Sequence, residues 1–268
     1  MLKDITLGQY FPGDTAAHRL DPRTKILLVL LYIIALFCAK GAAGYGLLAL
    51  TLAVCVRISK VGIKALVRGL KPVLFIILFT GLLNLFFTPG TRNLVEWGPV
   101  HISDTGVRTA IFMVLRIMLL IMGTFLMTYT TSPISLTDGL ERLLNGLKKL
   151  RMPVHELAMM MSIALRFIPT LIEETDKIMS AQKARGADFE SGNLIQKARA
   201  LIPILVPLFI SAFRRADELA TAMECRCYHG GEGRTKLHVL KYQGRDYVAL
   251  AIGAVILACV IALGRFGI

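Results

Sequence analysis

The chain has 268 residues, of which 55% are hydrophobic and only 18% are charged, and its formal net charge is +13. Soluble domains usually carry about 25% charged residues, so this composition excludes an ordinary water-soluble globule. The basic excess favours a membrane protein with its Lys and Arg gathered on one side, since nucleic-acid binding would leave the apolar excess unexplained.

Five apolar runs predict five transmembrane helices, so we expect an all-α, polytopic membrane protein. Several runs are shorter than the roughly 20 residues that a bilayer-spanning helix needs, but flanking Gly, Thr and snorkelling Lys extend them. In chain order the runs cover residues 26–39, 42–56, 73–87, 109–131 and 248–264.

The basic residues lie mostly in three segments that share one side of the membrane if the five spans alternate. Segments 1–25, 57–71 and 131–246 carry net charges of +1, +5 and +4, whereas the opposite side carries +2 in total. Because cytoplasmic loops are enriched in Lys and Arg, the N-terminus is predicted to be cytoplasmic and the C-terminus to lie outside. The expected location is the plasma membrane.

The first apolar run is expected to remain as a span rather than to be removed as part of a signal peptide. Three acidic residues precede it, and no small-residue cleavage site follows it. The cysteines also lack the pattern of an extracellular disulfide framework, since three lie in spans and two in the segment predicted to be cytoplasmic. They are Cys38, Cys55, Cys225, Cys227 and Cys259.

The segment 132–246 is predicted to be a cytoplasmic domain of long amphipathic helices. It separates an N-terminal membrane domain of four spans, residues 1–131, from a C-terminal transmembrane helix, residues 247–268. One helix is expected to begin at Pro133, because proline is favoured in the first turn of a helix. A second is expected to begin at Pro153 and to continue for about 30 residues, or on the order of 45 Å.

Residues 200–213 are apolar enough to resemble a sixth span, but the stretch is short and contains Pro203 and Pro207. We interpret it as a kinked helix that is buried under the membrane domain or dips into the interface. A true span is the alternative.

Two stretches of the cytoplasmic segment resemble each other at a constant offset of 41 residues. Residues 176–185 align with residues 217–226, with identical Asp, Ala and Arg. In each, an alanine precedes the terminal arginine, Arg185 or Arg226, by one helical turn. Small residues let a partner approach closely, and the arginine fork can pair with a carboxylate. Two such ends predict two similar docking sites, whereas an ordinary solvated helix face is the alternative.

The sequence resembles the transmembrane T component of energy-coupling factor (ECF) transporters, EcfT, over nearly its whole length. The resemblance rests on Leu-Asp-Pro-Arg-Thr-Lys at 20–25, on Leu-Arg-Phe-Ile-Pro at 165–169 and on the two helix ends at 181–186 and 222–228. It implies that both ends are Ala-Arg-Gly motifs of coupling helices that dock into grooves on two ATPase subunits. The positions concerned are Ala184, Arg185 and Gly186, and Cys225, Arg226 and Cys227, where Cys replaces both Ala and Gly.

The resemblance also implies a role and a set of partners. The chain would be the scaffold and transducer of an ABC-type importer, without catalytic residues, cofactor or metal. It would pass the motion of two ATP-binding subunits, expected as a heterodimer, to S components that bind a vitamin or a transition-metal ion. The residues agree that ATP is handled elsewhere, because the Gly-rich run at 230–235 lacks the Lys and the spacing of a P-loop.

Arg116 interrupts the fourth span, where an arginine costs roughly 2.5–3.5 kcal/mol on insertion scales. It is therefore predicted either to tie helices together or contact an S component, or to snorkel at the outer interface. A methionine cluster, Met159, Met160 and Met161, is a second candidate S-component contact, because flexible thioethers can repack against different surfaces. Ordinary core filling is the alternative for each methionine.

Three other patterns carry weaker interpretations. Cys225 and Cys227, with His229 and His238, match no common zinc spacing. The basic residues from Arg57 to Lys71 repeat at helical spacing and are expected to lie on anionic lipid headgroups, with ATPase contact as a further option. A membrane-embedded enzyme or a secondary carrier would need converging catalytic groups, or inverted repeats with intramembrane acids, and the spans supply neither.

Overall fold

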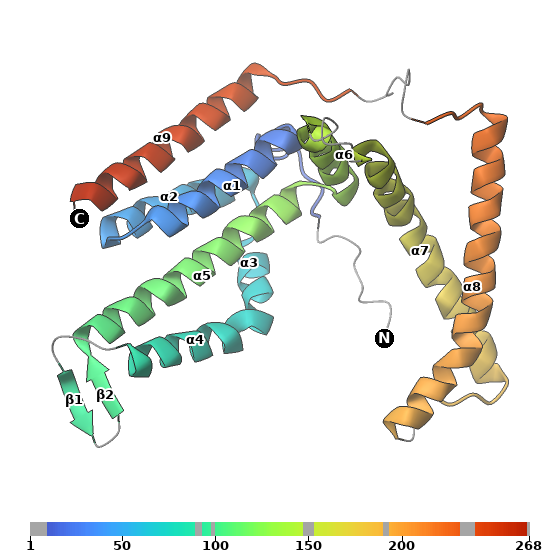
Figure 1. The fold of residues 1–268 in the computed structure, drawn as a ribbon, viewed down its shortest axis with the longest axis horizontal. Helices are drawn as coiled ribbons and strands as arrows, with labels where there is room; N and C mark the ends of the chain where they lie inside the picture. Colours follow the sequence, from blue (N-terminus) through green and yellow to red (C-terminus); the bar gives the residue numbers. More distant parts are fainter. Residues whose placement is uncertain are drawn as a thin grey trace. The chain divides into compact units, whose positions relative to one another are not determined.

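A computed structural model describes residues 10–88, 93–97, 100–146, 153–189, 193–230 and 239–266, and these are mostly α-helical (Figure 1). They divide into two compact units. We call residues 8–142 with 240–268 the membrane unit, and residues 143–239 the helix-pair unit. The expected all-α class is confirmed, with one short β-hairpin added to it.

The membrane unit contains most of the helices. These are α1 (Pro22–Cys38), α2 (Ala42–Ser59), α3 (Ile63–Leu70), the 3-10 turn η2 (Lys71–Val73), α4 (Leu74–Phe87), α5 (Asp104–Thr130), α6 (Pro133–Leu144) and α9 (Gly244–Phe266). The helix-pair unit contains α7 (Val154–Ala184) and α8 (Leu194–Cys225). The antiparallel strands β1 (Asn93–Trp97) and β2 (Val100–Ser103) lie between α4 and α5, within the segment expected to be a loop.

The core of the membrane unit forms where α1, α2, α5 and α9 meet. Leu36, Leu48 and Val260 are fully buried there. The helices α1 and α5 approach closely at Gly123, where a β-carbon would lie 2.8 Å from the ring of Tyr32. Such small residues bring transmembrane helices into contact when hydrophobic burial alone offers no driving force.

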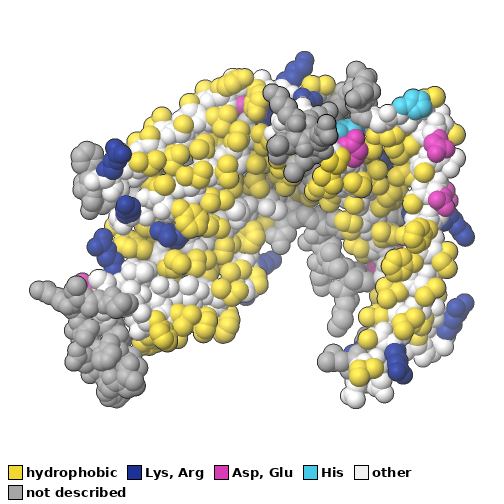
Figure 2. Space-filling model, in the orientation of Figure 1, with side chains coloured by type: hydrophobic (Ala, Val, Ile, Leu, Met, Phe, Trp, Pro, Cys, Tyr) yellow, Lys and Arg dark blue, Asp and Glu magenta, His cyan; other side chains and the backbone are white. Residues whose placement is uncertain are grey.

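The outer surface of the membrane unit is as apolar as its core. In α4, Phe75 and Phe87 are 75% and 79% exposed, and Figure 2 shows hydrophobic side chains spread over this unit. A soluble protein rarely exposes apolar patches beyond a few hundred Å². Within a bilayer the same surface faces hydrocarbon, and helices satisfy their own backbone groups there.

Helix length and composition test the predicted spans. Four of them fall within helices long and apolar enough to cross a membrane, and the first lies in α1, which has 17 residues. In the described part of the chain, α7 and α8 also qualify, which gives six candidates in all. The apolar stretch 200–213 is the middle of α8, which continues through Pro203 and Pro207 as one helix.

Candidate functional site

The helices α7 and α8 run in opposite directions and cross (Figure 1). At the crossing, the carboxylate of Glu174 accepts a hydrogen bond from the Ser211 hydroxyl and one from the Arg215 guanidinium, the latter at 2.6 Å. Nearer the end of α7, Gln182 donates to the carbonyl of Pro203 at 3.3 Å. The contact partners descend along α8 as they ascend along α7, as an antiparallel pair requires.

The crossing joins equivalent positions of the sequence repeat. The offset of 41 residues relates Glu174 to Arg215, so the ion pair joins one copy of the repeat to the same position in the other. The pair therefore has approximate two-fold symmetry about this contact. Arg185 follows Glu174 by 11 residues, and Arg226 follows Arg215 by 11 residues. Each arginine then lies about 16 Å along its helix from the crossing, on opposite sides of it.

The end of α7 is a Schellman turn. The amide of Gly186 donates to the Lys183 carbonyl at 3.0 Å, and the amide of Ala187 donates to the Gln182 carbonyl at 3.0 Å. Gly186 has a φ of +87°, in the left-handed region where glycine carries no β-carbon penalty. Its place in the Ala-Arg-Gly motif thus has a local physical reason.

The end of α8 repeats this turn at the same offset. The amide of Cys227 donates to the Glu224 carbonyl at 2.8 Å, and the amide of Tyr228 donates to the Met223 carbonyl at 3.0 Å. Cys227 has a φ of +54°, so a residue with a β-carbon holds the left-handed position that glycine holds in α7. That conformation costs a non-glycine residue roughly 1–2 kcal/mol.

Both terminal arginines are exposed. Among the residues that the structure describes, neither forms an ion pair. The positions flanking them are also exposed and small, so a partner surface can reach the guanidinium groups without displacing other side chains. These positions are Ala184, Gly186, Cys225 and Cys227.

Replacing Cys227 with glycine is expected to stabilise the terminal turn of α8 by about 1 kcal/mol, because it removes the left-handed penalty. The Tyr228 amide should then exchange with deuterium roughly five-fold more slowly, as mass spectrometry of the corresponding peptide can measure. Gly186→Ala should have the opposite effect in α7, through φ alone, because a β-carbon there would meet nothing within 4 Å. Cys225→Ala, inside the last turn, is the control, and equal exchange in all variants would contradict the argument.

Arg116 lies in α5 and reaches two neighbouring helices. Its Nε donates to the Tyr45 hydroxyl of α2 at 2.8 Å, and one Nη donates to the Ala39 carbonyl at the end of α1 at 3.4 Å. The guanidinium also lies 5.5 Å from the ring centre of Phe37. These contacts favour the inter-helix tie over a side chain that merely snorkels.

The methionine cluster lies in the first half of α7. Met160 and Met161 are 56% and 46% exposed, whereas Met159 is half-buried. Leu157, on the same turn of helix, is 51% exposed. The described residues thus present a flexible apolar surface beside the α7–α8 crossing.

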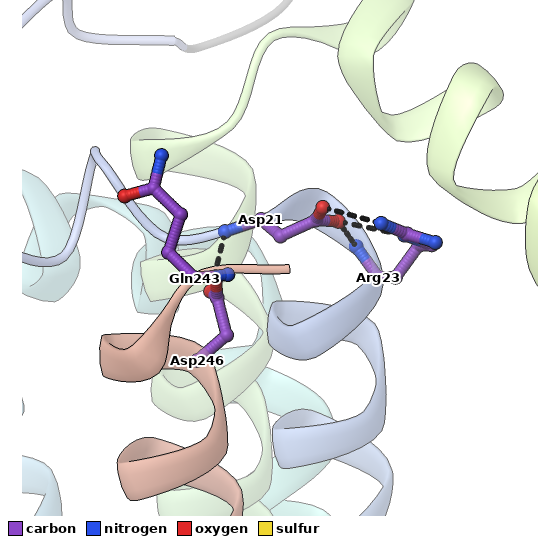
Figure 3. A network of polar contacts seen from close by, with 4 residues as sticks. All are labelled: Asp21, Arg23, Gln243 and Asp246. Atoms are coloured by element: carbon purple, nitrogen blue, oxygen red, sulfur yellow. Dashed lines mark hydrogen bonds and ion pairs between the residues drawn. The ribbon is translucent and has the colours of Figure 1, made fainter. Parts of the chain in front are cut away.

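The motif at residues 20–25 forms a polar network that ties α1 to α9 (Figure 3). The Asp246 carboxylate accepts from the backbone amide of Asp21 at 2.9 Å and from that of Gln243 at 2.8 Å. The Asp21 carboxylate accepts from the backbone amide of Arg23 and, at two oxygens, from its guanidinium. Arg23 also lies 3.9 Å above the Tyr242 ring. The sequence showed the motif but not the partner that Asp246 provides.

Two further features show how tightly this network is built. Burial opposes ionisation of Asp21, but the hydrogen bonds from Arg23 outweigh it and hold the Asp21 pKa below its usual range. Beside it, the Lys25 ammonium donates to the Thr130 carbonyl at the end of α5 at 2.8 Å. The network therefore fixes the starts of α1 and α9 against the end of α5.

The Cys225, Cys227 and His229 positions do not converge on a metal-binding arrangement. In the ranges that the structure describes, no group of three or more His, Cys, Asp or Glu side chains could hold a metal ion. His238 lies outside those ranges.

The described geometry defines a polytopic α-helical membrane protein with an antiparallel helix pair that presents two exposed arginine ends. The comparisons identify which one. Residues 13–237 match the family model CbiQ, described as cobalt transport protein. The chain is 54% identical over 99% of its length to the energy-coupling factor transporter transmembrane protein EcfT of Clostridium kluyveri, of which 98% is covered. It is 48% identical over 97% of its length to the EcfT protein of Bacillus subtilis, again with 98% covered.

The chain therefore belongs to the family of energy-coupling factor transporter transmembrane proteins, EcfT. Relatives across nearly the full length are named as membrane components of these transporters, which makes this chain a multi-pass membrane component of such a complex.

Proposed function

We propose that this chain is the non-catalytic scaffold and coupling subunit of an ECF-type ABC importer. Two ATP-binding subunits dock on the ends of α7 and α8, and their ATP-driven motion passes through the helix pair to an S component. The observation that carries this proposal is the approximate two-fold symmetry of Arg185 and Arg226 about the Glu174–Arg215 contact. Two equivalent ends suit two similar partner subunits, expected as a heterodimer.

In this proposal α7 and α8 lie along the cytoplasmic face instead of crossing the bilayer. Their length and composition alone would allow a span, but α7 carries Arg166, Glu173, Asp176 and Lys177 along its middle. Each charge at mid-membrane costs roughly 2.5–3.5 kcal/mol, so a surface position is favoured. The basic segments then put the N-terminus in the cytoplasm and the protein in the plasma membrane.

The exposed apolar surface of the helix pair supports a role in receiving the S component. Met160 and Met161 extend it in α7, and Phe209 and Phe213, 62% and 68% exposed, extend it in α8. A surface of this kind can repack against interchangeable partners. Arg116 acts in the membrane unit, either in holding its helices together or at the same partner. The cargo is a vitamin or a transition-metal ion, the latter in keeping with the family description of cobalt transport.

The direct test is affinity purification of the tagged full chain from its native membrane in a mild detergent. We expect two ATP-binding subunits and at least one small apolar S component to co-purify in fixed ratio. Arg199→Ala, which removes an exposed charge of α8 far from its end, is the matched control and should purify with the same partners. Recovery of the chain alone, with transport activity in vesicles that contain no other subunit, would overturn the proposal in favour of a self-contained carrier.

A further inference from the structure

A cavity of about 670 Å³ lies in the membrane unit between an N-terminal turn and the junction of α2 with α3. The turn, residues 11–18, is held in place by several contacts. His18 is hydrogen-bonded through its ring nitrogens to the Thr15 hydroxyl and the Phe11 carbonyl. The Phe11 amide donates to the Tyr129 carbonyl at the end of α5 at 3.0 Å. The cavity therefore has two walls that are fixed independently of each other.

The lining of the cavity is basic. Lys60, Lys64 and Arg68 line it, and none of them forms an ion pair with a residue that the structure describes. The one carboxylate in the lining, Asp14, is already engaged by two hydrogen bonds of 2.7 Å from Arg19. Three like charges around one space repel one another unless an anion occupies it.

The backbone at the junction is arranged in the same sense. Lys60 has a φ of +55°, a left-handed conformation that is costly for a residue with a β-carbon and that marks functional positions. No side chain caps the start of α3 at Gly62, so its first amides lack a side-chain acceptor. Free amides and the positive end of a helix favour phosphate, and the three basic side chains reinforce this preference.

The surroundings indicate where the phosphate comes from. The cavity lies where the apolar helix α2 ends and the next apolar segment begins, which is the depth of lipid headgroups. Around it, Ile58, Ile63 and Val67 are 50%, 66% and 50% exposed. A soluble ion would gain nothing from this apolar rim, whereas a lipid places its acyl chains there.

We propose that this cavity binds the phosphate of an anionic membrane lipid, with Lys60, Lys64 and Arg68 around the headgroup. The sequence predicts a basic face lying on the membrane, and the structure adds a cavity in that face. The site lies in a different unit from the terminal arginines. It therefore stands or falls independently of the docking of ATP-binding subunits.

The test compares two charge-matched variants of the full chain in mild detergent. Lys64→Gln/Arg68→Gln removes two charges from the cavity, and Arg57→Gln/Lys71→Gln removes two from neighbouring positions outside it. Native mass spectrometry then measures binding of phosphatidylglycerol, of phosphatidylcholine with the same acyl chains, and of inorganic phosphate. We expect the wild type to prefer phosphatidylglycerol, and the cavity variant to bind it roughly 30-fold more weakly. The control variant should lose less than about three-fold.

Each other outcome would overturn the proposal. Equal losses in both variants would mean that diffuse surface charge attracts the lipid. Inorganic phosphate binding as tightly as phosphatidylglycerol would mean that the ligand is a free ion. If the cavity variant does not fold, Lys60→Gln alone tests the same point, and unchanged lipid preference in it would count against the site.

Discussion

Replacing Arg185 and Arg226 together with alanine is expected to release the ATP-binding subunits and abolish coupled transport. Arginines at the centre of an interface commonly contribute 2 kcal/mol or more each, so the double change should weaken docking on the order of a thousand-fold. Each single change should leave one end docked and lower transport only in part. Co-purification of the subunits and uptake by proteoliposomes measure the two effects separately.

The control for this experiment is Arg199→Ala/Arg214→Ala. These arginines are also exposed on α8, but they lie away from the helix ends. The control removes the same charge and should leave docking and transport intact. Full transport by the Arg185→Ala/Arg226→Ala variant would rule out arginine-anchored docking, even if the chain still assembled with its partners.

Replacing Asp246 with alanine is expected to have the largest effect on stability. Its side chain is 1% exposed and accepts from the amides of Asp21 and Gln243, so the change leaves a buried amide without a partner. Losing hydrogen bonds to a buried carboxylate costs about 3 kcal/mol. We expect the midpoint of thermal inactivation in detergent, followed by size-exclusion chromatography, to fall by on the order of 5 °C or more.

Two further variants separate this network from a general effect of charge at the start of α9. Asp246→Asn keeps one carbonyl acceptor and should lose about half as much stability. Arg245→Ala changes the neighbouring exposed residue and should leave the midpoint unaltered. A midpoint for Asp246→Ala equal to that of Arg245→Ala would show that the α1–α9 network does not stabilise the membrane unit.

The helices of the membrane unit could be predicted from sequence because a bilayer offers the backbone no hydrogen-bond partners. A long apolar run must therefore close its own bonds as a helix. The run 109–131 lies almost entirely in α5, and 248–264 lies within α9. The hairpin of β1 and β2 was not predicted, because its nine residues carry no strong alternation and form a pair only with each other.

The arginine ends were also readable from sequence. Their repetition at an offset of 41 residues is a local pattern, and helix geometry alone aligns the alanine and the arginine on one face. The same offset pairs Gly186 with Cys227, which was a signal that Cys227 adopts a left-handed turn. What the pattern could not show was the antiparallel crossing that places Arg185 and Arg226 on opposite sides of one contact.

The sequence by itself thus determined which segments are helical, which ends carry arginine and that the chain belongs in a membrane. Those properties depend on composition and on neighbours within one or two helical turns. Only the tertiary structure decided that Glu174 meets Arg215, that Asp246 accepts from the Asp21 amide 225 residues away, and that three cations share one cavity. These contacts depend on how distant segments pack, and no local pattern of residues specifies which partner a buried polar group finds.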